Sequence, residues 1–276
     1  MRPFSNLHTN LDTTLANRHR VCIAALYAPC YYSSLRYNTG MDSPYTDQTT
    51  SQYSAVPWNL RDVSGAILLV VVGTLLLLII GGLVALVTGS LPALAVIVLS
   101  LALELLLIFG VWKFGLRRYG KSWSALGLIP SLNNGTLLAL LVFLASLALT
   151  ALYGFIVSYF GQDILAPEPL PGDLTETVLH RLAGFIVVVL LAPFAEEVFF
   201  RGFLLPAFAN RWGVLAGAII TSGLFGISHV APGSIVPAFM SGMLFAWLYH
   251  RTGSLWNTTI AHGAQNALAF AVTTPV

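Results

Sequence analysis

The sequence predicts an all-α, polytopic bundle of about seven transmembrane spans, one of them broken, preceded by a mostly disordered polar segment. Of the 276 residues, 57% are hydrophobic and only 9% are charged, and the mean hydropathy is +0.80. Soluble domains do not have this composition. A membrane span needs roughly 20 mostly apolar residues. From about residue 63 onward such stretches follow one another with short polar breaks between them.

The first 60 residues are polar, rich in Tyr, Ser and Thr, and lack the apolar core and cleavage site of a secretory signal. We therefore expect residues 1–60 to be mostly disordered and residues 61–276 to form the membrane domain. Met41 opens a second polar leader, which makes residues 1–40 a candidate upstream extension.

The apolar runs of the membrane domain are separated by polar or turn-forming residues. We expect spans at about 64–88, 92–115, 136–160, 178–209, 213–230, 234–250 and 255–274. The fourth run is too long for one straight crossing and contains Pro193 and Pro206. Because proline removes a backbone donor and kinks a helix, we expect a helix followed by a second, angled piece. Gly213 and Gly217 form a small-residue patch that predicts close approach of two helices.

Lysine and arginine gather at one end of the predicted bundle, and loops rich in these residues stay in the cytoplasm. The residues at this end are Arg61, Lys113, Arg117, Arg118, Lys121, Arg211 and Arg251. An acidic loop with Asp163, Glu168, Asp173 and Glu176 lies at the other end. We predict a multi-pass protein of the plasma (inner) membrane, with its N-terminus inside and its C-terminus outside.

Composition disfavours a nucleic-acid partner, and the two cysteines show no metal-binding or redox pattern. The net charge is only +2 and the basic residues are scattered, so the electrostatic footprint of a nucleic-acid binder is missing. Cys22 and Cys30 form no CxxC pair and have no histidine at metal-ligand spacing, so we assign them no role.

Within the predicted spans, the segment LLAPFAEEVFFRGFLLPAF carries adjacent acids. Glu197 and Arg201 are four residues apart, which places them on one helical face in the better order for an ion pair. Glu196 points about 100° away around the helix. Glu196 is thus free to face a cavity, where desolvation suits a carboxylate to act as general base and then general acid. The alternative is a buried Glu–Arg pair that only fixes helix packing.

Two further pairs repeat the four-residue spacing: Phe225 with His229, and His262 with Asn266. A single histidine in a membrane helix is as often a packing residue as a catalyst. Together with the glutamates, however, the set provides a base, two imidazoles and an amide that can donate to a developing oxyanion. These groups suit acyl hydrolysis by activated water, and no serine or cysteine has the setting of an activated nucleophile.

Glu104 is a further acid inside a span, and a charge at that depth costs about 3 kcal/mol on the lenient insertion scale. Its fourth neighbours along the helix are Ser100 and Ile108, so it has no partner within its own helix. We expect it to face another polar helix rather than the site.

These three elements, EExxxR at Glu196 to Arg201, FxxxH at Phe225 to His229 and HxxxN at His262 to Asn266, resemble the signature of the CAAX protease and bacteriocin-processing family, which includes the type II CAAX prenyl endopeptidases. The flanks are similar too, with a Pro-containing run before the glutamates, Arg-Gly after them and SLW ahead of the last histidine. The resemblance covers roughly residues 120–275.

The resemblance implies roles for the motif residues. Glu196 would activate the hydrolytic water with help from His229, and His262 and Asn266 would support the oxyanion. Structural support would come from Glu197, Arg201 and Phe225. A divalent metal such as Zn²⁺ is an open alternative, held by Glu196, His229 and His262. The chain has no HExxH motif, and a mechanism without a metal explains the asparagine equally well.

The implied function is that of an intramembrane endopeptidase, of the glutamate or the metallo type, which processes a protein or peptide such as a prenylated C-terminus. We expect the four catalytic candidates to surround one polar cavity that opens towards the cytoplasmic side. Two alternatives are a non-catalytic immunity or scaffold protein and a proton-coupled transporter. The transporter is disfavoured because the sequence lacks paired half-domain symmetry.

Overall fold

The computed structural model describes residues 56–131, 134–166 and 177–273, all within one compact unit, Ser43–Val276. Across these ranges every regular element is a helix, which confirms the predicted fold class. The predicted disordered segment lies outside the described residues except for its last five positions. Cys22, Cys30 and Met41 lie outside them as well, as do three of the four residues of the acidic loop.

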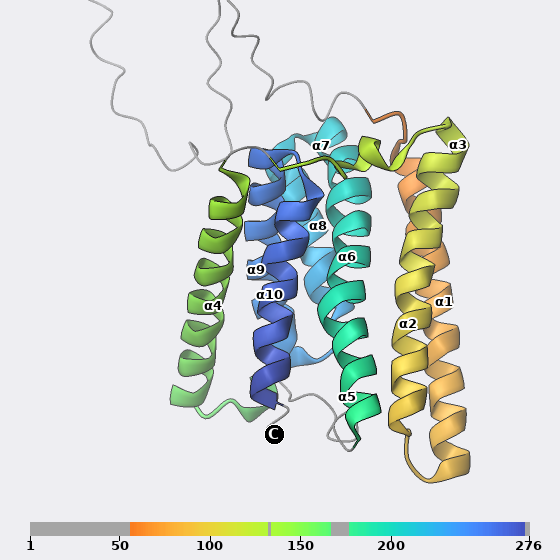
Figure 1. Ribbon diagram of the computed structural model, residues 1–276, viewed down its shortest axis with the longest axis vertical. Coiled ribbons are helices and arrows are strands. Elements are labelled where there is room, and N and C mark those ends of the chain that lie inside the picture. The colour runs from red at the N-terminus through yellow and green to blue at the C-terminus, as the bar shows by residue number, and fades with distance from the viewer. Residues whose placement is uncertain (1–55, 132–133, 167–176, 274–276) are drawn as a thin grey trace, which may run out of the picture. The chain divides into compact units, whose positions relative to one another are not determined.

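The described chain forms seven helical rods, one for each predicted span (Figure 1). The rods are α1 (Leu60–Thr88), α2 (Ala93–Val111) with its continuation to Tyr119, α4 (Gly135–Tyr159), a run from Val178 to Trp212, α8 (Val214–Ser228), α9 (Pro232–Thr252) and α10 (Leu255–Thr273). Short 3-10 turns, η4 (Trp123–Leu126) and η5 (Asp163–Leu165), lie in the connections. The predicted span limits therefore fall within a few residues of the helix ends.

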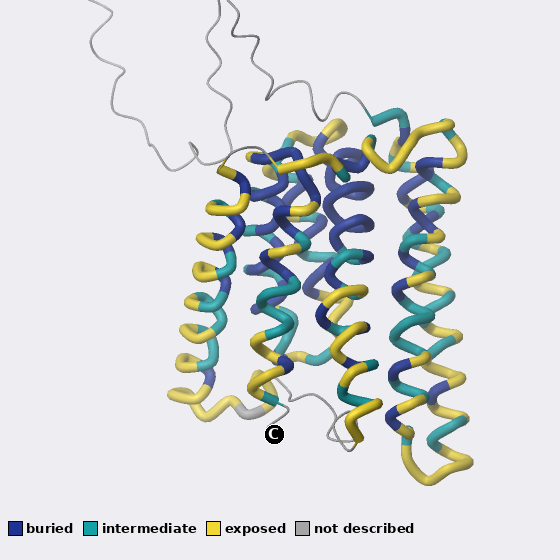
Figure 2. Tube along the Cα trace, in the orientation of Figure 1, coloured by how far each residue is buried: buried dark blue, intermediate teal, exposed yellow. Residues whose placement is uncertain are grey.

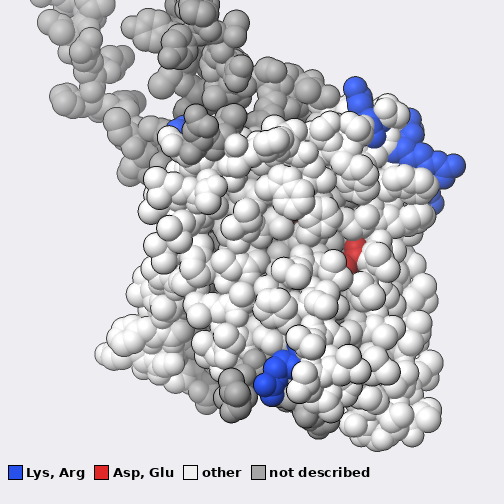
Figure 3. All heavy atoms as spheres, viewed as in Figure 1, with Lys and Arg blue, Asp and Glu red and all other residues white. Residues whose placement is uncertain are grey.

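Four of these rods are long and apolar enough to cross a membrane: Leu60–Thr88, Ala93–Tyr119, Gly135–Tyr159 and Val178–Trp212. The helix α8 is apolar but shorter. The exposed surface of α1 consists of large aliphatic side chains such as Leu68, Leu76 and Leu83, and an extended apolar surface of this kind needs an apolar environment. On the face drawn in Figure 3, most Lys and Arg lie at the upper end, one patch lies near the lower end, and the surface between them is almost free of charge. The chain is thus an integral, multi-pass membrane protein.

The buried part of the molecule is concentrated in the run from Val178 to Trp212. Every residue from 197 to 209 is buried. Figure 2 shows this interior in dark blue, with α4 and the lower parts of α1 and α2 more exposed. Polar groups placed in this interior are held away from lipid, and the motif residues Glu197 and Arg201 lie here.

Asp62 links the start of α1 to the end of the second rod. Asn59 caps α1, with its side chain accepting from the Arg61 N–H while Asp62 accepts from the Asn59 N–H. The Asp62 carboxylate also pairs with Arg118 (3.1 Å) and accepts from the Tyr119 hydroxyl (2.7 Å). These contacts fix the α1–α2 pair at the basic end of the bundle.

The run from Val178 to Trp212 stays helical through both prolines. Its segments are α5 (Val178–Phe185), η7 (Ile186–Leu191), α6 (Ala192–Glu197), η8 (Val198–Leu204) and α7 (Leu205–Trp212), with η7 and η8 being π-helical. Pro193 and Pro206 each lie two residues after a π segment. The predicted break therefore takes the form of two wider turns, which accommodate the missing proline donor without interrupting the helix.

Only one glycine of the predicted small-residue patch lies in a close helix contact. A Cβ at Gly217 would lie 2.8 Å from the Ala209 nitrogen, so glycine is required where α7 and α8 meet. Gly213 has open space around it and a φ of 86°, which marks it as the turn between the two helices.

Candidate active site

The Glu197–Arg201 pair forms as the sequence spacing predicts, and it is fully buried. Arg201 Nη1 lies 2.7 Å from Glu197 Oε1, and the two side chains are 1% and 0% exposed. The guanidinium also donates to the Gly242 carbonyl (3.3 Å) and stacks over the Phe225 ring, with 4.4 Å from Cζ to the ring centroid. The arginine therefore joins the fourth rod to α8 and α9.

His262 lies between the two glutamates. Its Nδ1 donates to Glu197 Oε1 (3.1 Å), and its Nε2 lies 3.5 Å from Glu196 Oε2. The contact to Glu197 fixes the orientation of the imidazole and leaves Nε2 directed at Glu196. Phe245 stacks on the same ring at 5.1 Å between centroids. Glu196 is the more accessible acid, with 20% of its side-chain surface exposed.

The separation of 3.5 Å between Glu196 Oε2 and His262 Nε2 is longer than a normal hydrogen bond. One water molecule can nevertheless lie beside the pair, at about 2.8 Å from each of the two atoms, and hydrogen-bond to both of them. The pair can therefore hold and polarise a single water.

His229 occupies the C-terminal end of α8, on the other side of Phe225. Its Nδ1 donates to the Phe225 carbonyl (2.8 Å), so Nε2 is left available. The Phe225 ring lies 4.7 Å from the His229 ring and 5.6 Å from the His262 ring, between centroids. Val230, the next residue, has a φ of 59°, a strained value for a β-branched side chain. Among the described residues no hydrogen bond or ion pair joins His229 to Glu196, so the geometry pairs Glu196 with His262 instead.

Asn266 donates to a backbone carbonyl that lacks its helical donor, because the residue in the donor position is proline. Its Nδ2 donates to the Val188 carbonyl at 2.9 Å. In a π turn the donor to that carbonyl would be residue 193, which is proline and has no N–H. Gly263 permits the close approach, because a Cβ there would lie 3.0 Å from the Val189 carbonyl oxygen. The second amide hydrogen of Asn266 remains for another acceptor.

Three of the four catalytic candidates line one cavity of about 330 Å³ between η7, α4, α8, α9 and α10. Its lining is Thr150, Val188, Phe225, His229, Ser234, Pro237, Ala238, Ser241, Phe245, His262, Gln265, Asn266 and Ala269. Glu196 is not part of this lining, but it lies beside His262, which is.

The cavity lies in the half of the bundle away from the basic loops. His229, at the end of α8, and Ser234, in the first turn of α9, mark its outer part, and His229 is exposed. The predicted opening towards the cytoplasmic, basic end is therefore wrong for the orientation that the lysine and arginine positions predict. The cause is the direction of α8. Its C-terminal end, which is followed by His229, lies at the end of the bundle opposite the basic loops.

Sequence reasoning missed a polar wall on the cavity. Ser146 donates to Gln265 Oε1 (2.6 Å) and lies 2.8 Å from the Ser241 hydroxyl, to which Gln265 Nε2 also donates (3.2 Å). Gln265 could have been found, because it follows His262 by three residues and so shares its helical face. Ser146 and Ser241 carry no such signal in the sequence.

Glu104 is 6% exposed, and its helix α2 packs against α6, the helix that carries Glu196 and Glu197. Glu104 is not part of the cavity lining. The expectation that it faces another polar helix rather than the site stays a prediction.

The residues proposed as metal ligands do not fit a three-ligand centre. No group of three His, Cys, Asp or Glu side chains that could hold a metal ion occurs in the described part of the chain. Glu196 and His262 converge, but Phe225 separates His229 from them and Arg201 engages Glu197.

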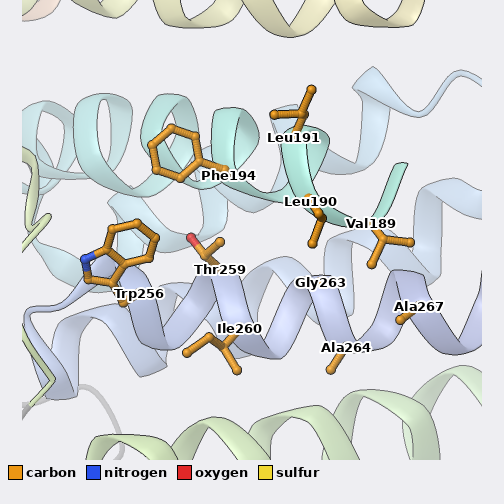
Figure 4. A pocket seen from close by; sticks show the side chains of 10 residues that line it. All are labelled: Val189, Leu190, Leu191, Phe194, Trp256, Thr259, Ile260, Gly263, Ala264 and Ala267. Atoms are coloured by element: carbon orange, nitrogen blue, oxygen red, sulfur yellow. The ribbon is translucent and has the colours of Figure 1, made fainter. Parts of the chain in front are cut away.

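A second hollow lies on another face of α10, about 530 Å³ in volume, between α10 and the η7–α6 segment (Figure 4). It is lined by Val189, Leu190, Leu191, Phe194, Trp256, Thr259, Ile260, Gly263, Ala264 and Ala267. None of these side chains can exchange a proton at neutral pH, so this groove offers no acid–base chemistry.

The fold and the site thus define a multi-pass membrane bundle with an acid, imidazole and amide centre among its helices. Residues 178–268 match the family described as type II CAAX prenyl endopeptidase Rce1-like. This match confirms the predicted resemblance over a narrower part of the chain than 120–275, and it includes all three motifs.

Two curated relatives from Bacillus subtilis (strain 168) are similar to the chain. It is 26% identical to "Putative membrane peptidase YdiL" over 129 residues, covering 43% of this chain and 53% of the relative. It is 38% identical to "Uncharacterized protein YyaK" over 94 residues, covering 31% of each. The chain thus spans about half of the first relative's length and less of the second's. No solved structure matches.

Proposed function

We propose that the protein is an intramembrane endopeptidase that hydrolyses a peptide bond with water activated by Glu196. One observation carries this proposal: Glu196 Oε2 and His262 Nε2 lie 3.5 Å apart beside a cavity that also contains the Asn266 amide. The match of this segment to the Rce1-like family supports the same class of reaction.

In the proposed reaction, a water bound between Glu196 and His262 gives one proton to the Glu196 carboxylate as its oxygen attacks the carbonyl carbon. The carbonyl oxygen becomes an oxyanion and accepts from the free amide hydrogen of Asn266. Glu196 then returns the proton to the amide nitrogen, the C–N bond breaks, and a carboxylic acid and an amine leave.

His229 is assigned a supporting role on the cavity side of Phe225. Its available Nε2 faces the space that a substrate would occupy, where it can hydrogen-bond the peptide. Ser241 and Gln265, which line the cavity and are held by Ser146 behind them, offer further partners for backbone amides. We propose a protein or peptide substrate, with a prenylated C-terminus as one candidate.

The test is cleavage by the purified full-length protein in lipid nanodiscs. Candidate substrates come from comparing the membrane proteome with and without the protein, and each cleavage is assayed in ¹⁸O-labelled water. Incorporation of one ¹⁸O into the new C-terminus is expected. Tight binding of these substrates without cleavage would contradict the proposal and favour the scaffold alternative.

We further propose that hydrolysis needs no metal, because Glu196 and His262 are the two groups that converge. A chelator at saturating concentration should change the cleavage rate by less than about twofold, well below the effect of losing a catalytic metal. The rate is measured before and after chelation and after adding back Zn²⁺. Loss on chelation with recovery on Zn²⁺ addition would refute this expectation.

Pro193→Ala should lower kcat about fivefold without lowering stability. The alanine N–H can bond to the Val188 carbonyl and compete with Asn266, and one such hydrogen bond contributes about 1 kcal/mol. Cleavage kinetics and the melting temperature measure the two effects.

Pro206→Ala is the matched control, since it changes the second proline of the same rod, which follows η8 rather than η7. It should keep kcat within about twofold, as expected for a change that removes no site hydrogen bond. Equal losses in the two variants would show that Pro193 acts on helix shape rather than on Asn266.

A further inference from the structure

In the described part of the chain, the cavity beside the candidate active site is open at one end and closed by packing at the other. Its innermost lining includes Phe245 and His262, which are 0% and 4% exposed. Its outer lining includes His229, which is exposed, and Ser234, which is half-buried. The path from the surface to the site therefore starts where α8 ends and α9 begins.

A layer of packed side chains lies between His262 and the basic end of the bundle. Its members lie one turn beyond Phe245 on α9 and one or two turns before His262 on α10, and each is less than 5% exposed: Leu248, Tyr249, Leu255 and Thr258. Figure 2 shows the same gradient along α10, from buried near its start to more exposed near its end.

The connection that carries η4 fastens this packed layer from the basic side. Its backbone carbonyls accept hydrogen bonds from the Tyr249 hydroxyl to Leu126 (3.1 Å), from the Ser254 hydroxyl to Ile129 (2.6 Å) and from the Leu255 N–H to Gly127 (2.8 Å). A Cβ at Gly127 would lie only 2.7 Å from the Tyr249 ring. Entry of a substrate from this end would break these bonds and part closely packed side chains.

The open end of the cavity faces away from the lysine and arginine residues that predict the cytoplasmic side. The helix α8 starts just after Arg211, and Arg251 lies in the last turn of α9. The junction between the two helices, residues 229–231, therefore lies at the opposite end of both. The mouth of the cavity is at the exocytoplasmic side, which is the side opposite the cytoplasm.

The lining of this path suits an extended peptide. Ser234 and Ser241 both line the cavity and are seven residues apart on α9, so they share one helical face. They are separated by about 10 Å along the helix axis, which is the length of about three residues of extended chain. A peptide can thus hydrogen-bond to side chains at both levels as it approaches His262.

We infer that the site receives its substrate from the exocytoplasmic side of the membrane, through the mouth beside His229 and Ser234. The substrate is then a polypeptide whose scissile bond lies outside the cytoplasm. A prenylated C-terminus that stays in the cytoplasm does not meet this condition. The inference deepens the proposed function and rests on it for the reaction, but not for the direction of access.

The direction of access is tested without a substrate, by labelling with a charged methanethiosulfonate that does not cross membranes. The full-length protein carries Cys22→Ser and Cys30→Ser, so that an introduced cysteine is its only one. Ser234→Cys probes the mouth, and Lys121→Cys, at an exposed position of a basic loop, is the matched control. Ser234→Cys should react in intact cells, and Lys121→Cys only in inverted membrane vesicles.

Thr258→Cys, in the packed layer, should react from neither side. Reaction of Ser234→Cys only in inverted vesicles, or in neither preparation, would overturn the inference. Reaction of Thr258→Cys in inverted vesicles would reveal an entrance at the basic end and would overturn it as well. Reaction of Lys121→Cys in intact cells would place the basic loops outside, with the same result.

The consequence for hydrolysis is tested with substrates found by the proteome comparison. Labelling of Ser234→Cys in intact cells should stop cleavage, and a reductant that removes the label should restore it. Labelled Lys121→Cys in inverted vesicles should keep its unlabelled rate. Undiminished cleavage by labelled Ser234→Cys would overturn the inferred route. Absence of any cleavage by the wild type would instead refute the proposed function and leave the labelling result standing.

Discussion

Replacing Glu196 with glutamine should reduce peptide hydrolysis by at least about 100-fold, because a positioned general base contributes between about 10² and 10⁴ in rate. The amide keeps the shape of the side chain and can still lie beside His262, but it cannot accept a proton from water. The protein should remain folded and inserted, since Glu196 is not part of the buried ion pair. Cleavage kinetics on purified protein measure the effect.

Asp62→Asn is the matched control for this change. It converts another buried acid to an amide, at the basic end of α1 and away from the cavity. Cleavage by Asp62→Asn per folded molecule should equal that of the wild type. Retention of more than a few per cent of wild-type cleavage in Glu196→Gln would remove Glu196 from the catalytic role.

Arg201→Ala should behave differently, with a loss of stability of about 3–5 kcal/mol, the usual cost of leaving one partner of a buried ion pair uncompensated. Glu197 is 0% exposed and its Oε1 would lose its cation, and the stacking on Phe225 and the bond to Gly242 would be lost as well. Activity and yield should fall together. Chemical or thermal unfolding in detergent measures the stability.

Arg211→Ala, an exposed arginine near the end of the same rod, is the control and should change stability by less than about 0.5 kcal/mol. A variant Arg201→Ala that is fully stable and merely inactive would show that the arginine takes part in the reaction. Glu197→Ala should be destabilised in the same way as Arg201→Ala.

The helices could be predicted because lipid imposes a strong constraint on the sequence. Each apolar run must form a helix to satisfy its own backbone, so hydropathy alone placed every rod. The i,i+4 spacing of Glu197 and Arg201 likewise predicted their pairing, because both partners belong to one helix. Local geometry of this kind is contained in the sequence.

Contacts between helices could not be predicted in the same way. The family resemblance assigned His229 as the helper of Glu196, whereas His262 is the imidazole that lies beside Glu196 in the structure. Which imidazole meets the acid depends on the relative height of α6, α8 and α10, and the sequence does not contain this height. The two π turns were also hidden, because a single wider turn leaves the apolar pattern nearly unchanged.

The position of the cavity has a consequence for the supply of reactants in the proposed reaction. Hydrolysis consumes one water molecule in each turnover, and hydrocarbon around the bundle contains almost none. The cavity runs from exposed His229 to buried His262, and its wall carries the hydroxyl and amide groups of Ser241 and Gln265. Each of these groups can hydrogen-bond a passing water. Under the proposed function, the space that admits the peptide is therefore also the path for water, and a bound peptide that filled it completely would exclude the water needed for its own cleavage.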